Sequence, residues 1–182
     1  RYLHLGGFYR YAATDGKTRY KGKPGSNVAS NFVDTGEFPA EGANHYGLEG
    51  LLSWGGLSLL GEYAVADVKS SAKGDPAFSG WYLTGSWVLT GESRPYDRKV
   101  GYARRVIPRS AWGAPELVLR YSDVDLDDGA VQGGRFTRVD VGVNWWATTR
   151  WKFGLDWGRT ELDRNGKSGS TDTLLTRVQW VY

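Results

Sequence analysis

The C-terminal part of the chain, residues 139–182, alternates between apolar and polar side chains with a period of two. Its first run carries apolar side chains at Val139, Val141, Val143 and Trp145. The same pattern returns at Trp151, Phe153, Leu155 and Trp157, and again at Thr176, Val178, Trp180 and Tyr182. Because successive side chains of a strand point to opposite faces, each run predicts a strand with one apolar face and one polar face.

Tryptophan and tyrosine stand at the ends of these apolar faces, which is typical of strands that meet the two interfaces of a membrane. The pattern therefore predicts a transmembrane β-barrel, apolar toward lipid and polar toward a lumen. Composition agrees, because aromatic residues make up 14% of the chain although its mean hydropathy is only −0.48. A membrane-spanning helix needs about 18 consecutive apolar residues, and the most apolar stretch, residues 51–66, is interrupted by glycine, serine and glutamate.

Five earlier segments show the same alternation, namely residues 3–12, 46–54, 57–65, 81–89 and 117–121. Only Gly55-Gly56 separates the second segment from the third, which indicates a tight hairpin. With the three C-terminal runs, the sequence predicts an all-β fold. We expect an antiparallel transmembrane β-barrel with about eight strands in this chain, and a single domain over residues 1–182.

The connections between these segments differ in length. If the C-terminus lies in the periplasm, the polar stretches 13–44, 67–77, 125–134 and 163–170 are expected to be outside loops, and 55–56 and 147–149 to be periplasmic turns. The long connection 92–113 falls on the periplasmic side. It carries six basic residues against Glu92 and Asp97, a net charge of +4. Such a segment either folds into the lumen and attracts anions there, or stays in the periplasm as a solvated loop.

No constellation of residues points to catalysis, a metal or a cofactor. The two histidines, His4 and His45, are far apart and lack the spacing of metal ligands. No serine lies in a nucleophile elbow. Carboxylates on the predicted strands are expected to form ion pairs with strand-borne arginine and lysine. We therefore expect that the protein is not an enzyme and binds no cofactor or nucleic acid.

Several segments resemble the phosphate-selective porin family (porins O and P). The most specific is Leu89-Thr90-Gly91-Glu92-Ser93-Arg94-Pro95-Tyr96, which follows Gly80-Trp81-Tyr82-Leu83-Thr84-Gly85. Further similar pieces are Phe32-Val33-Asp34-Thr35-Gly36, Leu119-Arg120-Tyr121-Ser122 and Gly142-Val143-Asn144-Trp145-Trp146. The matches follow the order of the family and cover most of the chain, but they correspond to the family's C-terminal half.

The resemblance implies a homotrimeric channel in the bacterial outer membrane of Gram-negative cells, with sixteen strands and a cationic pore for anions such as phosphate. The chain has about half the length that such a barrel needs. Either an N-terminal portion is absent from this sequence or the half-barrel stands alone. An eight-stranded barrel has an interior that side chains fill, so alone it is expected to conduct poorly.

We expect an outer-membrane porin through which small anions diffuse passively, with outer-membrane lipid around it. The residues expected to line the pore and bind anions are Arg94, Arg98, Arg104, Arg105, Arg109, Arg120, Arg138, Lys152 and Arg177. One alternative is a small non-conducting barrel that anchors or scaffolds a partner protein. A soluble ligand-binding barrel, with an apolar lumen and a polar exterior, is a further alternative.

Overall fold

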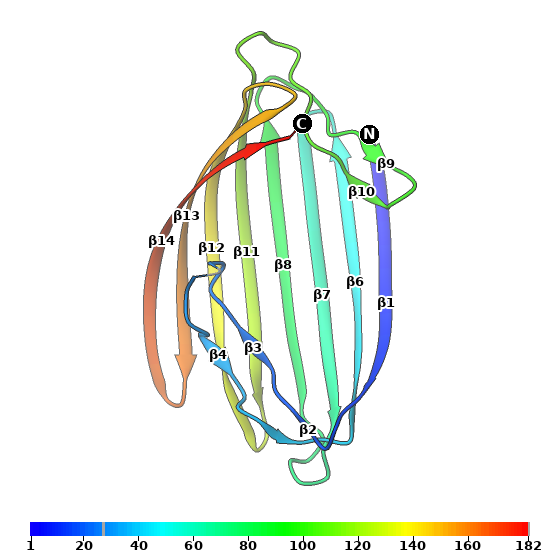
Figure 1. Cartoon of the computed structure of the whole chain (residues 1–182), viewed down its shortest axis with the longest axis vertical. Coiled ribbons are helices and arrows are strands. Elements are labelled where there is room, and N and C mark those ends of the chain that lie inside the picture. Colours follow the sequence, from blue (N-terminus) through cyan, green and yellow to red (C-terminus); the bar gives the residue numbers. More distant parts are fainter. Residues whose placement is uncertain (27, 182) are drawn as a thin grey trace.

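Eight long antiparallel strands form one sheet in the computed structural model, which describes residues 1–26 and 28–181. They follow one another side by side in chain order (Figure 1). Their bounds are β1 (Tyr2–Ala13), β6 (Gly42–Trp54), β7 (Leu57–Lys69), β8 (Ala77–Val88), β11 (Ala114–Asp128), β12 (Val131–Trp146), β13 (Trp151–Arg164) and β14 (Lys167–Trp180). The predicted all-β fold with eight antiparallel strands is confirmed.

Three pairs of short strands lie in the two longest connections. Between β1 and β6, β2 (Lys17–Thr18) pairs with β5 (Phe38–Pro39), and β3 (Lys21–Gly22) pairs with β4 (Val33–Asp34). Between β8 and β11, β9 (Tyr96–Asp97) pairs with β10 (Tyr102–Ala103). The described residues form no helix long and apolar enough to cross a membrane.

The apolar side chains predicted to face outward lie on the convex face of the sheet and are exposed there. Leu5 on β1 is 74% exposed and Leu48 on β6 is 70% exposed. The aromatic residues Trp54, Trp87 and Trp180 are also exposed, near one end of the strands. A continuous exposed apolar surface of this kind is stable only against an apolar partner such as lipid acyl chains.

The apolar band runs obliquely across the strands. In the strand register, Tyr63 pairs with Trp81, Trp81 pairs with Asp123, and the same row continues through Thr137 to Glu161. The outward row therefore changes from aromatic to polar between β8 and β11. An apolar band that keeps one height along the barrel axis can move along the strand register in this way only if the strands are tilted relative to that axis. Strands of transmembrane barrels are inclined by about 35–45°.

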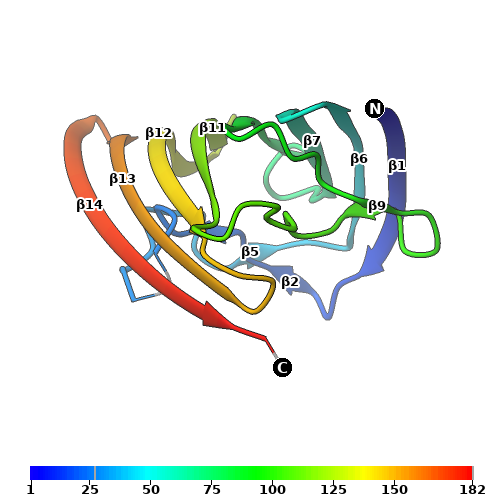
Figure 2. The same cartoon turned by 90° about the horizontal axis from the view of Figure 1, so that it is seen from above.

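The sheet curves but does not close on itself. Seen from above, it bends through the full set of strands and leaves a gap between β14 and β1 (Figure 2). Among the described residues, no hydrogen-bonded ladder joins β1 to β14, so both are edge strands. Long unpaired edges are exposed to pairing with further strands. The sheet alone therefore does not form the closed eight-stranded barrel that was one of the two alternatives from the sequence.

At the end of the sheet opposite the C-terminus, the strands extend beyond the apolar runs. Two of the predicted loops are therefore wrong in their bounds. Residues 125–134 and 163–170 were expected to be loops, but they belong mostly to strands joined by two-residue turns. The second turn is Asn165-Gly166, and both residues have positive φ, at 55° and 70°. Asn-Gly readily adopts this conformation in hairpins. The predicted outward position of Tyr182 lies outside the described residues.

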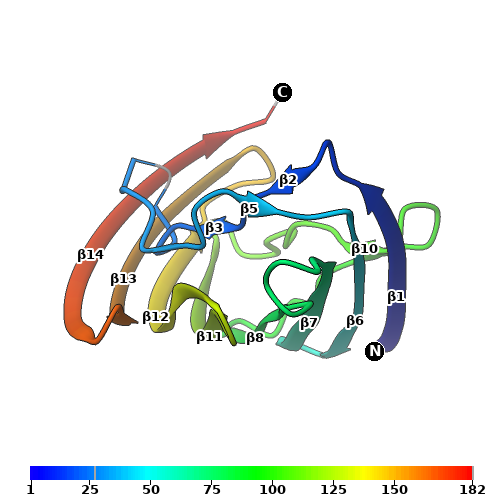
Figure 3. The same ribbon diagram turned by 90° about the horizontal axis from the view of Figure 1, so that it is seen from below.

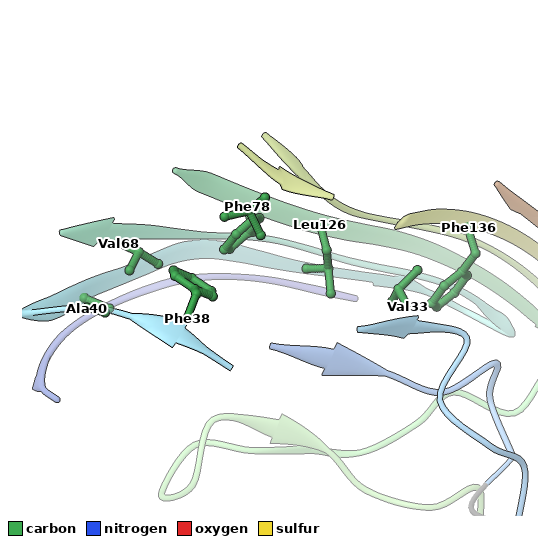
Figure 4. Close-up of a cluster of buried hydrophobic side chains, with 9 residues drawn as sticks. Val33, Phe38, Ala40, Val68, Phe78, Leu126 and Phe136 are labelled. Atoms are coloured by element: carbon green, nitrogen blue, oxygen red, sulfur yellow. The ribbon is translucent and has the colours of Figure 1, made fainter. Parts of the chain in front are cut away.

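Both long connections fold onto the concave face of the sheet. Figure 3 shows β2, β3 and β5 crossing the hollow side between β1 and the later strands. This first connection covers an apolar cluster that includes Val33, Phe38, Phe78, Leu126 and Phe136 (Figure 4). Inward apolar side chains of the strands are buried there because the connection, and not water, lies over them.

Candidate channel-lining site

Away from this cluster, the concave face carries polar and charged side chains from the strands. The register places Glu49 opposite Glu62. It also places Arg120 between Thr84 on one neighbouring strand and Asp140 on the other. These residues face inward because each stands one position away from an outward apolar residue. The concave face therefore offers charges of both signs along the direction of the strands.

The connection from residue 89 to residue 113 covers this face near the C-terminal end of the chain. Its hairpin, β9 with β10, reaches β1, where the Tyr96 hydroxyl lies 2.6 Å from His4 Nδ1. The rings of Tyr96 and Tyr2 are 4.7 Å apart. Between the connection and the sheet is a cavity of about 420 Å³, lined by His4, Glu49, Glu62, Thr84, Arg94 and Tyr102 among others. The connection thus lies across the concave face at this end (Figure 2).

Arg138 on β12 fastens the other connection, residues 14–41, to the sheet. Its side chain is only 4% exposed, and all three guanidinium nitrogens contact oxygen atoms of the protein. The acceptors are one oxygen of Asp140, at 2.7 and 2.5 Å, the carbonyl oxygen of Pro24 at 2.6 Å, Thr160 Oγ1 at 2.9 Å and Thr173 Oγ1 at 2.8 Å. A guanidinium that is buried and bound through all three nitrogens holds structure in place and is poorly placed to bind a passing anion.

Arg120 lies between the parts of the face that the two connections cover. Its guanidinium carbon is 3.6 Å from the centre of the Tyr82 ring, and its Nη1 donates to Thr84 Oγ1 at 3.3 Å. A second cavity, of about 390 Å³, is lined by Arg120 and also by Lys23, Arg138 and Glu62. Glu62 and Thr84 also line the first cavity. A guanidinium has five N–H groups and the bond to Thr84 engages one of them, so Arg120 keeps donors for a ligand.

The other basic residues that were predicted to line the pore form two groups. Lys152 and Arg177 face the concave side, with the Lys152 ammonium 4.7 Å from the centre of the Trp146 ring and Arg177 next to Gly154 and Asn144. The arginines of the long connection are Arg94, Arg98, Arg104, Arg105 and Arg109. Arg94 pairs with Glu116.

Of the other four, Arg104 pairs with Asp97 of the same hairpin, and its Nε donates at 2.8 Å. Arg105 donates to the carbonyl of Thr149 at 2.6 Å. The side chains of Arg98 and Arg109 are exposed. The cations most open to a solute are therefore Arg98, Arg109, Arg120 and Arg177.

Comparison with known proteins shows which family has this arrangement. The family model for phosphate-selective porin O and P matches residues 12–182. The chain belongs to this family. It is 28% identical to Porin O of Pseudomonas aeruginosa over 152 residues, which covers 75% of this chain and 35% of Porin O. It is also 29% identical over 168 residues to an uncharacterized protein of Caulobacter vibrioides, which covers 86% of this chain and 33% of that protein.

This porin chain thus spans about a third of the length of the curated relatives that it matches. The resemblance drawn from the sequence motifs is confirmed at the level of the family. An open sheet with two unpaired edges agrees with a chain that corresponds to one part of such a protein.

Sequence reasoning about the porin missed the ionic contacts that matter most. It expected strand carboxylates such as Asp140 to pair with arginine or lysine on the strands, without placing the partner. The partner of Asp140 is Arg138, two residues earlier on the same strand. It did not single out Glu116, whose side chain is fully buried. Nothing in the local sequence separates Glu116 from other inward carboxylates, because its partner Arg94 comes from a distant connection.

Because Arg19 and Asp34 form an ion pair in the 14–41 connection, we expect this segment to stay folded in mild acid. Arg19 Nε and Nη2 donate to the two oxygens of Asp34 at 2.8 and 2.5 Å, and these bonds hold the pKa of Asp34 well below its usual range. A depressed folded-state pKa adds stability above the unfolded value of about 3.9. That stability is lost only as pH falls through the lower folded pKa.

Hydrogen exchange of the Gly36 amide, which donates to Asp34 Oδ1 at 3.0 Å, measures this effect. After correction for intrinsic rates, its protection is expected to persist from pH 7 down to pH 4. The Asp34→Asn variant is expected to lose the protection at every pH. A loss with a midpoint near pH 5 in the unchanged protein would contradict this account.

Proposed function

We propose that this chain forms part of the wall of an outer-membrane channel that passes small anions such as phosphate by passive diffusion. The family match and the exposed apolar band support a channel in the outer membrane, and not an enzyme. The complete protein is then a sixteen-stranded barrel, assembled as a homotrimer, in which further strands pair with β1 and β14. Its lumen is the concave face described above.

The observation that carries this proposal is the position of Arg120. It lies between two folded-in connections and lines the second cavity, which shares Glu62 with the first, so a solute moving along the concave face passes its guanidinium. A half-buried guanidinium with donors to spare attracts phosphate and other oxyanions and replaces part of their hydration. Lys152 and Arg177 extend the row of cations toward the end of the sheet at which β14 ends. Several separate cations bind an anion weakly enough for it to leave.

The 89–113 connection adds a positive field at this end. Folded into the lumen, its exposed Arg98 and Arg109 raise the local concentration of anions. Arg94 and Arg138 act differently in this proposal, because each is paired with a carboxylate of the protein, Glu116 and Asp140 respectively. They hold the two connections in the positions that narrow the channel.

Ion selectivity of the full-length protein in planar bilayers tests the proposal. In a salt gradient, the reversal potential of the unchanged protein is expected to show preference for anions over cations. The Arg98→Glu and Arg109→Glu double variant is expected to lower the anion-to-cation permeability ratio by about threefold or more, since four units of charge change near the pathway.

Arg159→Glu is the matched control, because Arg159 stands in an outward row beyond the apolar band, away from the concave face. It is expected to leave the reversal potential unchanged. A cation preference in the unchanged protein would overturn the proposed function. An unchanged reversal potential in the double variant would remove the connection from the pathway.

A further inference from the structure

Glu116 on β11 is a buried carboxylate whose charge partner is supplied by a distant connection. Its side chain is 0% exposed, and that of Arg94 is 20% exposed. Glu116 accepts hydrogen bonds from Arg94 Nη2, from Asn144 Nδ2 at 3.1 Å and from Trp146 Nε1 at 2.9 Å. Asn144 and Trp146 belong to β12, which pairs with β11 in the sheet and is not part of the connection.

The burial of Glu116 therefore depends on the connection being closed over it. A buried carboxylate is tolerated when it is paired with a cation and hydrogen-bonded, and it is strongly unfavourable when the cation is removed. The Arg94 guanidinium also lies over the Trp146 ring, at 5.3 Å from its centre. Arg94 is thus held by its ion pair with Glu116 and by its contact with the face of the Trp146 ring.

A second attachment holds the far side of the hairpin. Val106 is fully buried in a small apolar cluster with Val88, Ala114 and Trp146. Residues 95–105, which include β9 and β10, lie between this attachment and Arg94. Apart from the contacts of Tyr96 with His4 and Tyr2, the hairpin tip is exposed at Arg98, Lys99 and Val100. The hairpin is consequently anchored at its two ends, with further contacts from Tyr96 to β1 and from Arg105 to Thr149.

We propose that the Arg94–Glu116 pair is a latch that holds this hairpin across the concave face and so sets the width of the channel at this end. This inference rests on the proposed function. Arg94 and Glu116 are positioning residues and touch no solute. When the latch is broken, the hairpin turns about the Val106 attachment, and the cavity beneath it, lined by Glu49, Glu62 and Ala103, opens to the pathway.

Cysteine labelling detects the position of the hairpin directly. The 182 residues contain no cysteine, and Ala103 on β10 is partly buried and faces the cavity beneath the hairpin. In the full-length protein, with no other cysteine present, Ala103→Cys is to be labelled with a membrane-impermeant maleimide. Glu116→Gln keeps the size of the side chain but removes its charge, and is expected to speed labelling at least tenfold and to raise single-channel conductance.

Two further variants separate the latch from general damage. Arg94→Gln removes the other partner and is expected to have the same two effects. Asp97→Asn breaks the Arg104–Asp97 pair, which lies within the hairpin and does not reach the sheet, and is expected to change neither measurement. Heat-modifiable migration on gels, which folded outer-membrane barrels show, identifies the variants that have folded.

The outcomes distinguish the latch from the proposed function. Unchanged labelling and conductance in the folded Glu116→Gln protein, or in folded Arg94→Gln if the first variant does not fold, would overturn the latch. If labelling accelerates although the unchanged protein shows no preference for anions, the latch is supported and the anion channel is overturned. If labelling is unchanged while anions are preferred, only the latch fails.

Discussion

The Arg120→Glu variant is expected to pass cations in preference to anions. The reason is the balance of charge around the second cavity on the concave face. Asp140 and Asp123 are compensated by ion pairs with Arg138 and Arg135. The other charged residues that line the cavity are Lys23, Arg120 and Glu62, whose formal charges sum to one net positive charge. The substitution changes this to one net negative charge.

The size of the effect follows from Coulomb's law. At an effective dielectric constant of about 20, one unit charge at about 8 Å contributes about 2 kcal/mol to the energy of a passing ion. The variant changes two units, so the anion-to-cation permeability ratio is expected to fall by at least tenfold, even after screening by salt. The reversal potential of the full-length protein in a salt gradient is the measurement.

The control for Arg120 keeps its charge. Arg120→Lys preserves a cation at this position but loses the planar guanidinium that stacks on Tyr82 and binds oxyanions with two donors. It is expected to remain anion-preferring and to bind phosphate more weakly, measured as a higher phosphate concentration for half-maximal block of chloride current. A reversal potential that is the same in Arg120→Glu and in the unchanged protein would place Arg120 outside the pathway.

The strands and their faces could be predicted from the sequence because each depends on a local, repeating pattern. Leu3 and Leu5 on β1, and Trp151 and Phe153 on β13, are exposed on the convex face, as the period of two requires. The same pattern gave the wrong ends for the strands. Beyond Trp157 the outward residues Arg159 and Glu161 are charged, yet β13 continues to Arg164.

The reason is that the apolar pattern reports contact with lipid, whereas strand pairing continues past the membrane surface. In water, a strand needs only backbone hydrogen bonds to its neighbours, and these do not depend on whether its outward side chains are polar. Polar stretches such as residues 125–134 were therefore read as loops. The positive φ angles of Asn165 and Gly129 mark the true turns.

The roles of individual cations could not be predicted, because they depend on contacts between distant residues. Arg120 and Arg138 are both inward arginines one position from an outward apolar residue, and the sequence treats them alike. The structure distinguishes them through Pro24, which lies 114 positions away and accepts a hydrogen bond from Arg138. Arg94 and Glu116 are likewise brought together only when the long connection folds back. Their anchoring roles follow from burial, and burial is a property of the folded connections.

Gly158 on β13 is expected to be the least replaceable residue around Arg138. It is buried, and a Cβ atom at this position would overlap the guanidinium of Arg138 and the carboxylate of Asp140. Both groups are at the ends of side chains, but Arg138 is held by four hydrogen bonds and an ion pair. Its displacement leaves a buried charge with unmatched partners.

The Gly158→Ala variant is therefore expected to lower the free energy of unfolding by about 3 kcal/mol, the cost of disrupting a buried ion pair. It is also expected to release the 14–41 connection, which Arg138 holds through Pro24. Denaturant unfolding of the full-length protein in detergent measures the first effect, and faster proteolysis between residues 14 and 41 measures the second.

Gly169 on β14 is the matched control for Gly158. It also lies within a strand and has an ordinary φ, but an added Cβ would meet nothing within 4 Å. Gly169→Ala is expected to leave stability unchanged or slightly raised, because alanine restricts the unfolded chain more than glycine does. If both variants lose stability equally, glycine is needed at these positions for strand geometry in general. If only Gly158→Ala loses stability, and with it the protection of residues 14–41, the space beside Arg138 is what keeps the first connection folded against the concave face.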